Sequence, residues 1–186
     1  MNKKLWQPQT TIHAISFDCD GTLSNIEGID ELAALSHTKE EEVAALTHRA
    51  MNLTGLSSSL YEQRLALVKP TLEHTESLAD LYWDNMTVDC QQVIEILQRL
   101  NKEIYIISAG NNPAVSLFGR KLSIPQKNIF AIDIFFDAKG NYSGFDKASA
   151  LCESSGKVDI LKAIKQQHQI VLHIGDGLND TPAVDT

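Results

Sequence analysis

Short apolar segments and amphipathic segments alternate along most of the chain. The apolar segments contain β-branched residues and match buried strands of a parallel sheet; they cover residues 12–17, 104–107, 129–131 and 170–174. Apolar positions at helical spacing, or proline in a first turn, predict helices over residues 88–101, 113–122 and 157–167. Residues 135–142 predict a hairpin that turns at 139–141. This alternation predicts an α/β fold with a doubly wound parallel sheet.

A block of helical segments interrupts the alternation after the first strand. Helices are expected over residues 29–35, 38–52, 59–69 and 75–85. Capping-box patterns begin the second and third at Thr38 and Ser59, and Pro70 ends the third. We therefore expect an α-helical cap of residues 27–86, and a core made of residues 1–26 and 87–186.

Composition and charge narrow the possible partners. A chain of 186 residues suits one domain or one domain with a modest insertion, and its net charge of −8 argues against nucleic acid and anionic membranes. No apolar run is long enough to cross a bilayer, and no apolar segment of a signal peptide follows Lys3 and Lys4. Cys19, Cys90 and Cys152 suit buried thiols in a reducing compartment, so we expect a cytoplasmic protein.

Two carboxylates follow the first predicted strand. Asp18 and Asp20 stand at i and i+2, so both can face one volume at the carboxyl end of that strand, where open α/β sheets bind ligands. Two anions this close need a compensating cation, and Mg²⁺ suits carboxylate oxygens. One could be a nucleophile that forms an aspartyl phosphate, and the other a general acid and base. The alternative is that both only begin a turn before Gly21.

A serine and a lysine occupy comparable positions later in the chain. Ser108 follows the apolar segment 104–107 and precedes Ala109 and Gly110, and a hydroxyl with free backbone N–H groups suits phosphate oxygens. The alternative for Ser108 is a simple cap or turn residue. Lys157 opens a predicted helix, where a cation is unfavourable unless an anion lies nearby. The alternative for Lys157 is a solvated side chain.

A second acidic pair follows the last predicted strand, at Asp176 and Asp180. If this strand neighbours the first, Asp176 would share the Mg²⁺ ion with the first carboxylates. Asp180 would then orient Lys157 or a metal-bound water. Acidic loops without a function exist, but they rarely follow two strands with a serine and a lysine between them.

Taken together, these segments resemble the signature motifs of the haloacid dehalogenase superfamily. The four motifs correspond in order to DCDGTL at residues 18–23, Ser108, Lys157 and GDGLND at residues 175–180. The resemblance spans residues 12–180. It implies the doubly wound core of that superfamily, an α-helical cap inserted after the first strand, and Mg²⁺ as cofactor.

Within the superfamily, the chain is similar to the phosphoserine phosphatase family. The similarity lies in Glu27, in Met51 with Arg64 thirteen residues later, and in residues 140–146 before residues 154–157. It implies hydrolysis of a small phosphorylated metabolite, O-phospho-L-serine, through an aspartyl-phosphate intermediate in serine biosynthesis. A free amino acid carries one carboxylate and one ammonium group. The planar guanidinium of an arginine can bind the carboxylate, and a glutamate can bind the ammonium, so these two residues agree with such a substrate.

The same resemblance implies a role for each motif residue. Asp18 would be the nucleophile and Asp20 the general acid and base, and Mg²⁺ would be bound by Asp18, the backbone carbonyl of Asp20 and Asp176. The remaining roles are phosphate binding by Ser108, Ala109, Gly110 and Lys157, substrate binding by Glu27, Arg64 and Met51, and support by Asn179 and Asp180.

Several positions depart from the family pattern. Leu53 and Ala109 stand where glycine is usual, and Ser57 stands where an aromatic residue is usual. These departures leave the exact substrate open. The chain ends six residues after Asp180, where family members continue through a further strand and helix, so we expect a truncated chain with an uncovered sheet edge.

Other functions remain open at this point. The same mechanism could act on another small phosphomonoester or transfer the phosphoryl group to an alcohol. A non-enzymatic phospho-receiver or Mg²⁺-binding module, or an inactive truncated remnant, is also possible. Receivers carry their phosphate on an aspartate after a middle strand, whereas here segment 104–107 leads to Ser108, and receivers have no helical insertion. The sequence does not indicate an oligomeric state.

Overall fold

The fold is described from a computed structural model, which describes residues 10–38, 40–49, 56–177 and 179–180. Five strands form one sheet in the order β4-β3-β2-β1-β5. Their bounds are β1 (Ala14–Phe17), β2 (Glu103–Asn112), β3 (Ile129–Phe136), β4 (Tyr142–Phe145) and β5 (Val171–Ile174). All pairings are parallel except that of β4 with β3, which is the predicted hairpin.

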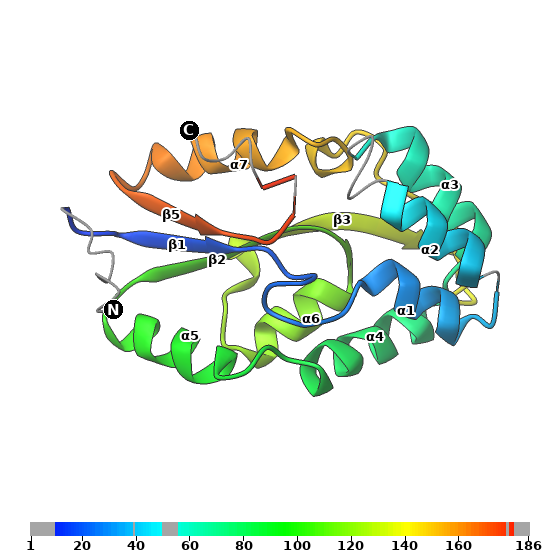
Figure 1. The fold of residues 1–186 in the computed structure, drawn as a ribbon, viewed down its shortest axis with the longest axis horizontal. Coiled ribbons are helices and arrows are strands. Elements are labelled where there is room, and N and C mark those ends of the chain that lie inside the picture. Colours follow the sequence, from blue (N-terminus) through cyan, green and yellow to red (C-terminus); the bar gives the residue numbers. More distant parts are fainter. Residues whose placement is uncertain (1–9, 39, 50–55, 178, 181–186) are drawn as a thin grey trace, which may run out of the picture.

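Helices cover both faces of this sheet, as a doubly wound fold requires. Figure 1 shows α7 (Gly156–Lys165) on one face and α5 (Cys90–Arg99) and α6 (Ala114–Lys121) on the other. The central strands are apolar because both of their faces are buried, and Ile106, Ile107 and Phe118 have no exposed surface. The predicted α/β architecture is confirmed.

Four helices follow β1 and gather beyond the carboxyl ends of the strands (Figure 1). They are α1 (Gly28–Leu35), α2 (Glu40–Arg49), α3 (Ser58–Val68) and α4 (Leu72–Asp84). Helix α4 also packs on α6, where the rings of Tyr82 and Phe118 lie with their centroids 5.6 Å apart. The division of the chain into a cap of residues 27–86 and a core remains a prediction.

Several predicted element ends are wrong, and local hydrogen bonds explain why. Helix α3 is capped by Ser57, whose Oγ accepts from the backbone N–H of Leu60 at 3.3 Å, and not by Ser59. Helix α4 begins three residues before the predicted start, because Thr71 and His74 form a reciprocal capping box. Histidine replaces the usual glutamate of that motif, so the pattern is not visible in the sequence.

Strand β2 does not end at Ser108 as predicted but continues to Asn112. Its pairing with β3 is irregular between Ile107 and Asn111, which is where polar and small residues replace the apolar run. Strand β3 likewise extends beyond the predicted residues 129–131. Because of these extensions, the segment that contains Ser108 is part of the sheet and is not a separate turn.

The register of the sheet places the carboxyl ends of β1 and β5 side by side, next to the middle of β2. Phe17 of β1 lies opposite Ile106 of β2 on one side and Ile174 of β5 on the other. The residues that follow these positions therefore meet at one edge of the sheet. Within the part of the chain that the structure describes, no helix is both long and apolar enough to span a membrane.

Candidate active site

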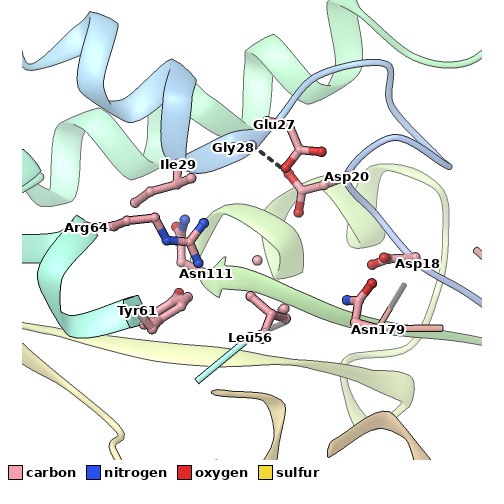
Figure 2. Close-up of a pocket in the computed structure, with 12 residues that line it drawn as sticks. Asp18, Asp20, Glu27, Gly28, Ile29, Leu56, Tyr61, Arg64, Asn111 and Asn179 are labelled. Atoms are coloured by element: carbon pink, nitrogen blue, oxygen red, sulfur yellow. Dashed lines mark hydrogen bonds between the residues drawn. The ribbon is translucent and has the colours of Figure 1, made fainter. Parts of the chain in front are cut away.

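A pocket lies between the strand ends and the helices that follow β1. Figure 2 shows Asp18 and Asn179 at one side of it and Arg64, Tyr61 and Ile29 at the other. The described residues that line it are Asp18, Asp20, Glu27, Gly28, Ile29, Leu56, Tyr61, Arg64, Ala109, Gly110, Asn111 and Asn179. One chamber thus joins the acidic strand ends to a buried arginine.

Asp18 follows β1 and is almost completely buried. Its side chain is 4% exposed, and Lys157 Nζ donates to Asp18 Oδ2 at 2.5 Å. Burial raises the pKa of Asp18, the charge of Lys157 lowers it, and the charges of Asp180 and Asp20 raise it, so that it reaches about 6. A buried carboxylate with a cation at one oxygen can be ionised and still point its other oxygen toward a ligand.

Lys157 is a buried cation between two carboxylates. It is 2% exposed, and its Nζ also donates to Asp180 Oδ1 at 2.6 Å. These two anions compensate a lysine at the start of α7, which confirms the expectation of a nearby anion and excludes a solvated side chain. Removal of Lys157 would leave Asp18 and Asp180 buried without a counterion.

Asp180 is held in place from three directions. His173 Nε2 lies 2.8 Å from Asp180 Oδ1, and the backbone N–H of Gly177 donates to Oδ2 at 2.9 Å. Burial alone would raise the pKa of Asp180, but the hydrogen bond to His173 and the charge and hydrogen bond of Lys157 outweigh it, and the pKa falls to about 2. Asp180 is therefore a permanent anion that fixes the position of Lys157.

Three carboxylates converge at the ends of β1 and β5. One oxygen each of Asp18, Asp176 and Asp180 lies within 4.8 Å of the others. Asp176 is exposed and accepts a hydrogen bond from the Thr22 hydroxyl at 3.2 Å. The amide oxygen of Asn179 is buried and has no hydrogen-bond partner among the described residues. This all-oxygen donor set fits Mg²⁺, which prefers carboxylates and other oxygen ligands.

Asp20 lines the pocket and is held by two hydrogen bonds from the helical segments that follow β1. Its Oδ1 accepts hydrogen bonds from the Gly28 backbone N–H at 2.6 Å and from the Tyr82 hydroxyl at 2.8 Å (Figure 2 shows the former). Burial raises the pKa of Asp20, although the hydrogen bonds from Gly28 and Tyr82 oppose this effect. A carboxyl group with a raised pKa, held rigidly in a pocket, is suited to exchange protons with a ligand.

Ser108 lies behind the pocket wall and is fully buried. Its Oγ accepts from the Gly110 backbone N–H at 2.8 Å and donates to Asp20 Oδ2 at 3.4 Å. A Cβ added to Gly110 would lie 2.8 Å from Asp20 Oδ2, so glycine is required where this backbone approaches the carboxylate. Ala109 lines the pocket and packs against Leu56 and Leu60.

Glu27 and Arg64 are the charged groups on the helical side of the pocket. Burial, followed by the charges of Asp20, Asp30 and Asp176, raises the pKa of Glu27 to about 8. Arg64 is 4% exposed, and its Nε has no hydrogen-bond partner among the described residues. Burial lowers the pKa of Arg64, and its guanidinium carbon lies 5.4 Å from the centre of the Tyr61 ring. Both residues line the pocket.

The structure thus brings most of the predicted residues together. Asp18, Asp20, Glu27, Arg64, Ala109, Gly110 and Asn179 line the pocket, while Ser108, Lys157, Asp176 and Asp180 surround its acidic end from behind. Met51 and Leu53 lie outside the described residues. The structure reports positions only, and the roles assigned to these residues remain predictions.

Sequence analysis missed four polar residues of this region: Tyr61, Tyr82, Asn111 and His173. Tyr82 contacts Asp20 from a segment 62 residues away, and His173 contacts Asp180 from seven residues earlier in the chain; no motif marks either residue. Tyr61 precedes Arg64 by less than one helical turn, so the helical spacing could have indicated it. Asn111 follows Gly110 directly, in the part of β2 that was predicted to be a turn.

Comparison with known proteins defines the class to which this arrangement belongs. The model of the haloacid dehalogenase-like hydrolase family matches residues 12–184. The chain is 34% identical over 172 residues to the human phosphoserine phosphatase, covering 91% of this chain and 76% of the relative. The chain belongs to the haloacid dehalogenase-like hydrolases and, within them, to the phosphoserine phosphatase family.

Other relatives and solved structures agree with this assignment. The chloroplastic phosphoserine phosphatase of Arabidopsis thaliana is 31% identical over 181 residues, which are 96% of this chain and 60% of the relative. A phosphoserine phosphohydrolase-like protein from Francisella tularensis superposes with a TM-score of 0.81 at 25% identity, covering 94% of this chain and 82% of that one. The protein is thus a phosphoric monoester hydrolase, which rejects the non-enzymatic phospho-receiver.

Proposed function

We propose that the protein hydrolyses O-phospho-L-serine to L-serine and phosphate in a Mg²⁺-dependent reaction through a phosphoryl group on Asp18. The observation that carries this proposal is that one pocket holds Asp18 and Asp20 together with Glu27 and Arg64. Asp18 and Asp20 suit transfer of a phosphoryl group, and Glu27 and Arg64 suit binding of the ammonium and carboxylate groups of a free amino acid. The relatives named phosphoserine phosphatase support the choice of substrate.

The first half of the reaction would be an attack by a carboxylate oxygen of Asp18 on phosphorus. The bond between phosphorus and the serine oxygen breaks, and Asp20, whose pKa is raised by burial, gives its proton to that oxygen. In the second half, Asp20 takes a proton from water, the water oxygen attacks phosphorus, and Asp18 leaves as a carboxylate. One solved relative is described as a phospho-aspartyl intermediate analogue of phosphoserine phosphatase, which supports this route by similarity.

The phosphoryl oxygens would be held by the groups around Asp18. Lys157 reaches Asp18 Oδ2 and so lies beside the reacting oxygen, and the backbone at Ala109 and Gly110 lines the same pocket. Ser108 already positions Gly110 through its hydroxyl. Donors that are fixed before the substrate arrives stabilise the charge that develops during phosphoryl transfer.

The residues that would hold Mg²⁺ are Asp18, the backbone carbonyl of Asp20, and Asp176, with Asp180 and Asn179 supporting them. A bound Mg²⁺ supplies positive charge for the phosphoryl oxygens and offsets the repulsion between the carboxylates. The fit rests on the three carboxylate oxygens that lie within 4.8 Å of one another. A role in serine biosynthesis in the cytoplasm, and a cap formed by residues 27–86, belong to the same proposal.

Substrate recognition would use the other side of the pocket. Arg64 would bind the carboxylate of phosphoserine, because its Nε is buried without a partner and a guanidinium donates to two carboxylate oxygens at once. Glu27 would bind the ammonium group and would lose its proton in doing so. Met51 would complete the contact surface.

The test is phosphate release from O-phospho-L-serine by the chain, with Mg²⁺ and with EDTA. We expect turnover only with Mg²⁺, and loss of at least about 10³-fold in Asp18→Asn, which keeps the shape but not the nucleophile. The matched control is Asp80→Asn, because Asp80 is an exposed residue of α4 and lies outside the pocket. Full turnover by Asp18→Asn would refute the nucleophile, and turnover of p-nitrophenyl phosphate alone would refute the substrate. Adding a small alcohol separates hydrolysis from phosphoryl transfer.

A further inference from the structure

Two neighbouring asparagines at the end of β2 have different surroundings. Asn112 is paired at both ends of its amide: its Nδ2 donates to Asp133 at 2.9 Å and its Oδ1 accepts from the Ser116 hydroxyl at 2.7 Å. Asn111 is 2% exposed, lines the pocket, and has an Oδ1 without a hydrogen-bond partner among the described residues. Asn112 thus has a structural role, which Asn111 does not share.

A buried carbonyl oxygen without a partner destabilises the folded protein, and such groups are rare in native structures. Such a group needs an explanation, and a ligand that supplies the missing partner is one. The Nε of Arg64, in the same pocket, is also unpaired. One unpaired acceptor and one unpaired donor therefore belong to two residues that line the same pocket, which indicates a ligand that carries both a donor and an acceptor.

The charges of the pocket decide which donor would reach Asn111. Arg64 attracts the anionic end of a ligand, so the cationic end is left for the acceptors. Burial raises the pKa of Glu27 most, and the charges of the carboxylates around it raise it further. A neutral amide oxygen adds an acceptor to this environment without adding another negative charge. An ammonium group has three N–H donors, so it can bind a second acceptor in addition to Glu27.

We propose that Asn111 is a substrate-binding residue whose Oδ1 accepts a hydrogen bond from the ammonium group of the substrate. With Glu27, it selects phosphomonoesters that carry a primary amine over those that do not. This inference rests on the proposed function and adds to it the residue that reads the amine. It also assigns a use to an oxygen that the fold of β2 leaves unpaired.

The test compares two substrates that differ only in the amine, O-phospho-L-serine and 3-phosphooxypropionate. The quantity measured is the ratio of their kcat/KM values, which does not depend on the fraction of enzyme that is folded. Asn111→Leu removes the acceptor, and Asn111→Asp keeps it. We expect the ratio to fall roughly tenfold or more in Asn111→Leu, the size typical of a hydrogen bond to a charged group, and to be retained in Asn111→Asp.

Each outcome decides the question. An unchanged ratio in Asn111→Leu would overturn the proposal, because the oxygen would then be satisfied by water alone. An equal fall in Asn111→Asp would also overturn it, since the amide nitrogen would then be the group in contact with substrate. If Asn111→Leu does not fold, Asn111→Ala removes the same acceptor. A parent chain without preference for the amine refutes the proposed function as well, whereas a preference that survives in both acceptor-free variants refutes only the role of Asn111.

Discussion

Replacement of Glu27 by glutamine should change the pH dependence of stability. Burial and the nearby charges of Asp20, Asp30, Asp176 and Asp18 raise the pKa of Glu27 from 4.5 to about 8. Between these two pKa values, Glu27 keeps its proton in the folded protein but has released it in the unfolded chain. The free energy of unfolding therefore falls as pH rises through this range, and it levels off above the folded pKa. Glutamine has the same shape and does not titrate.

The expected size follows from the difference between the two pKa values. At about 1.36 kcal/mol for each pH unit, the interval from 4.5 to about 8 sets a ceiling of about 5 kcal/mol. Glu27 lies at the wall of a pocket that water can enter, so solvent screening reduces this effect. We expect the advantage of Glu27→Gln over the parent chain to grow by about 2 kcal/mol between pH 5.5 and pH 8.5.

The assay is urea unfolding followed by tryptophan fluorescence at pH 5.5, 7.0 and 8.5 in EDTA. Comparing each variant with the parent cancels the other groups that titrate in both chains. Glu76→Gln is the matched control, because Glu76 is an exposed glutamate of α4. The control should run parallel to the parent at every pH. If Glu27→Gln also ran parallel to the parent, the raised pKa and the reasoning about crowded carboxylates would be refuted.

Three further changes test other parts of the site. Arg64→Met should lose roughly 100-fold in kcat/KM for phosphoserine relative to p-nitrophenyl phosphate, because it removes the buried guanidinium that lines the pocket. A parallel loss on both substrates would contradict this. Gly21→Ala should abolish Mg²⁺-dependent phosphate release, because the added Cβ would lie 2.3 Å from Asp176 Oδ2. The control Gly140→Ala has a similar positive φ but no such contact, so it should keep phosphate release. Ser154→Ala should lower the free energy of unfolding by about 1–2 kcal/mol, because Ser154 Oγ accepts a hydrogen bond from the N–H of Leu56 and donates one to its C=O. An unchanged urea midpoint would contradict this prediction.

The elements and their order could be predicted because they depend on local patterns. Apolar runs identify β1 and β5, and helical spacing identifies α5 and α7, without knowledge of the rest of the chain. Element ends were less predictable, because a cap depends on backbone geometry as well as on residue type. Ser57 and Ser59 both suit a cap by composition, and only the extended backbone at Ser57 decides between them.

The acidic end of the site could also be predicted from the sequence. Asp18 and Asp176 follow apolar strands, and parallel strands bring such positions to the same edge of a sheet. The hydrogen-bond partners of the site carboxylates could not be predicted from the sequence. Tyr82 reaches Asp20 across 62 residues, and His173 reaches Asp180 because the chain turns back at Gly175, so neither contact has a local pattern.

The sequence by itself determined the fold class, the family and the set of carboxylates, because each depends on residue type, spacing and order along the chain. Only the tertiary structure decided that Lys157 is shared between two carboxylates, that Glu27 and Arg64 face the same pocket as Asp18, and that the oxygen of Asn111 is unpaired. Burial and pairing depend on every segment that packs around a side chain. They therefore cannot be read from the few residues on either side of it.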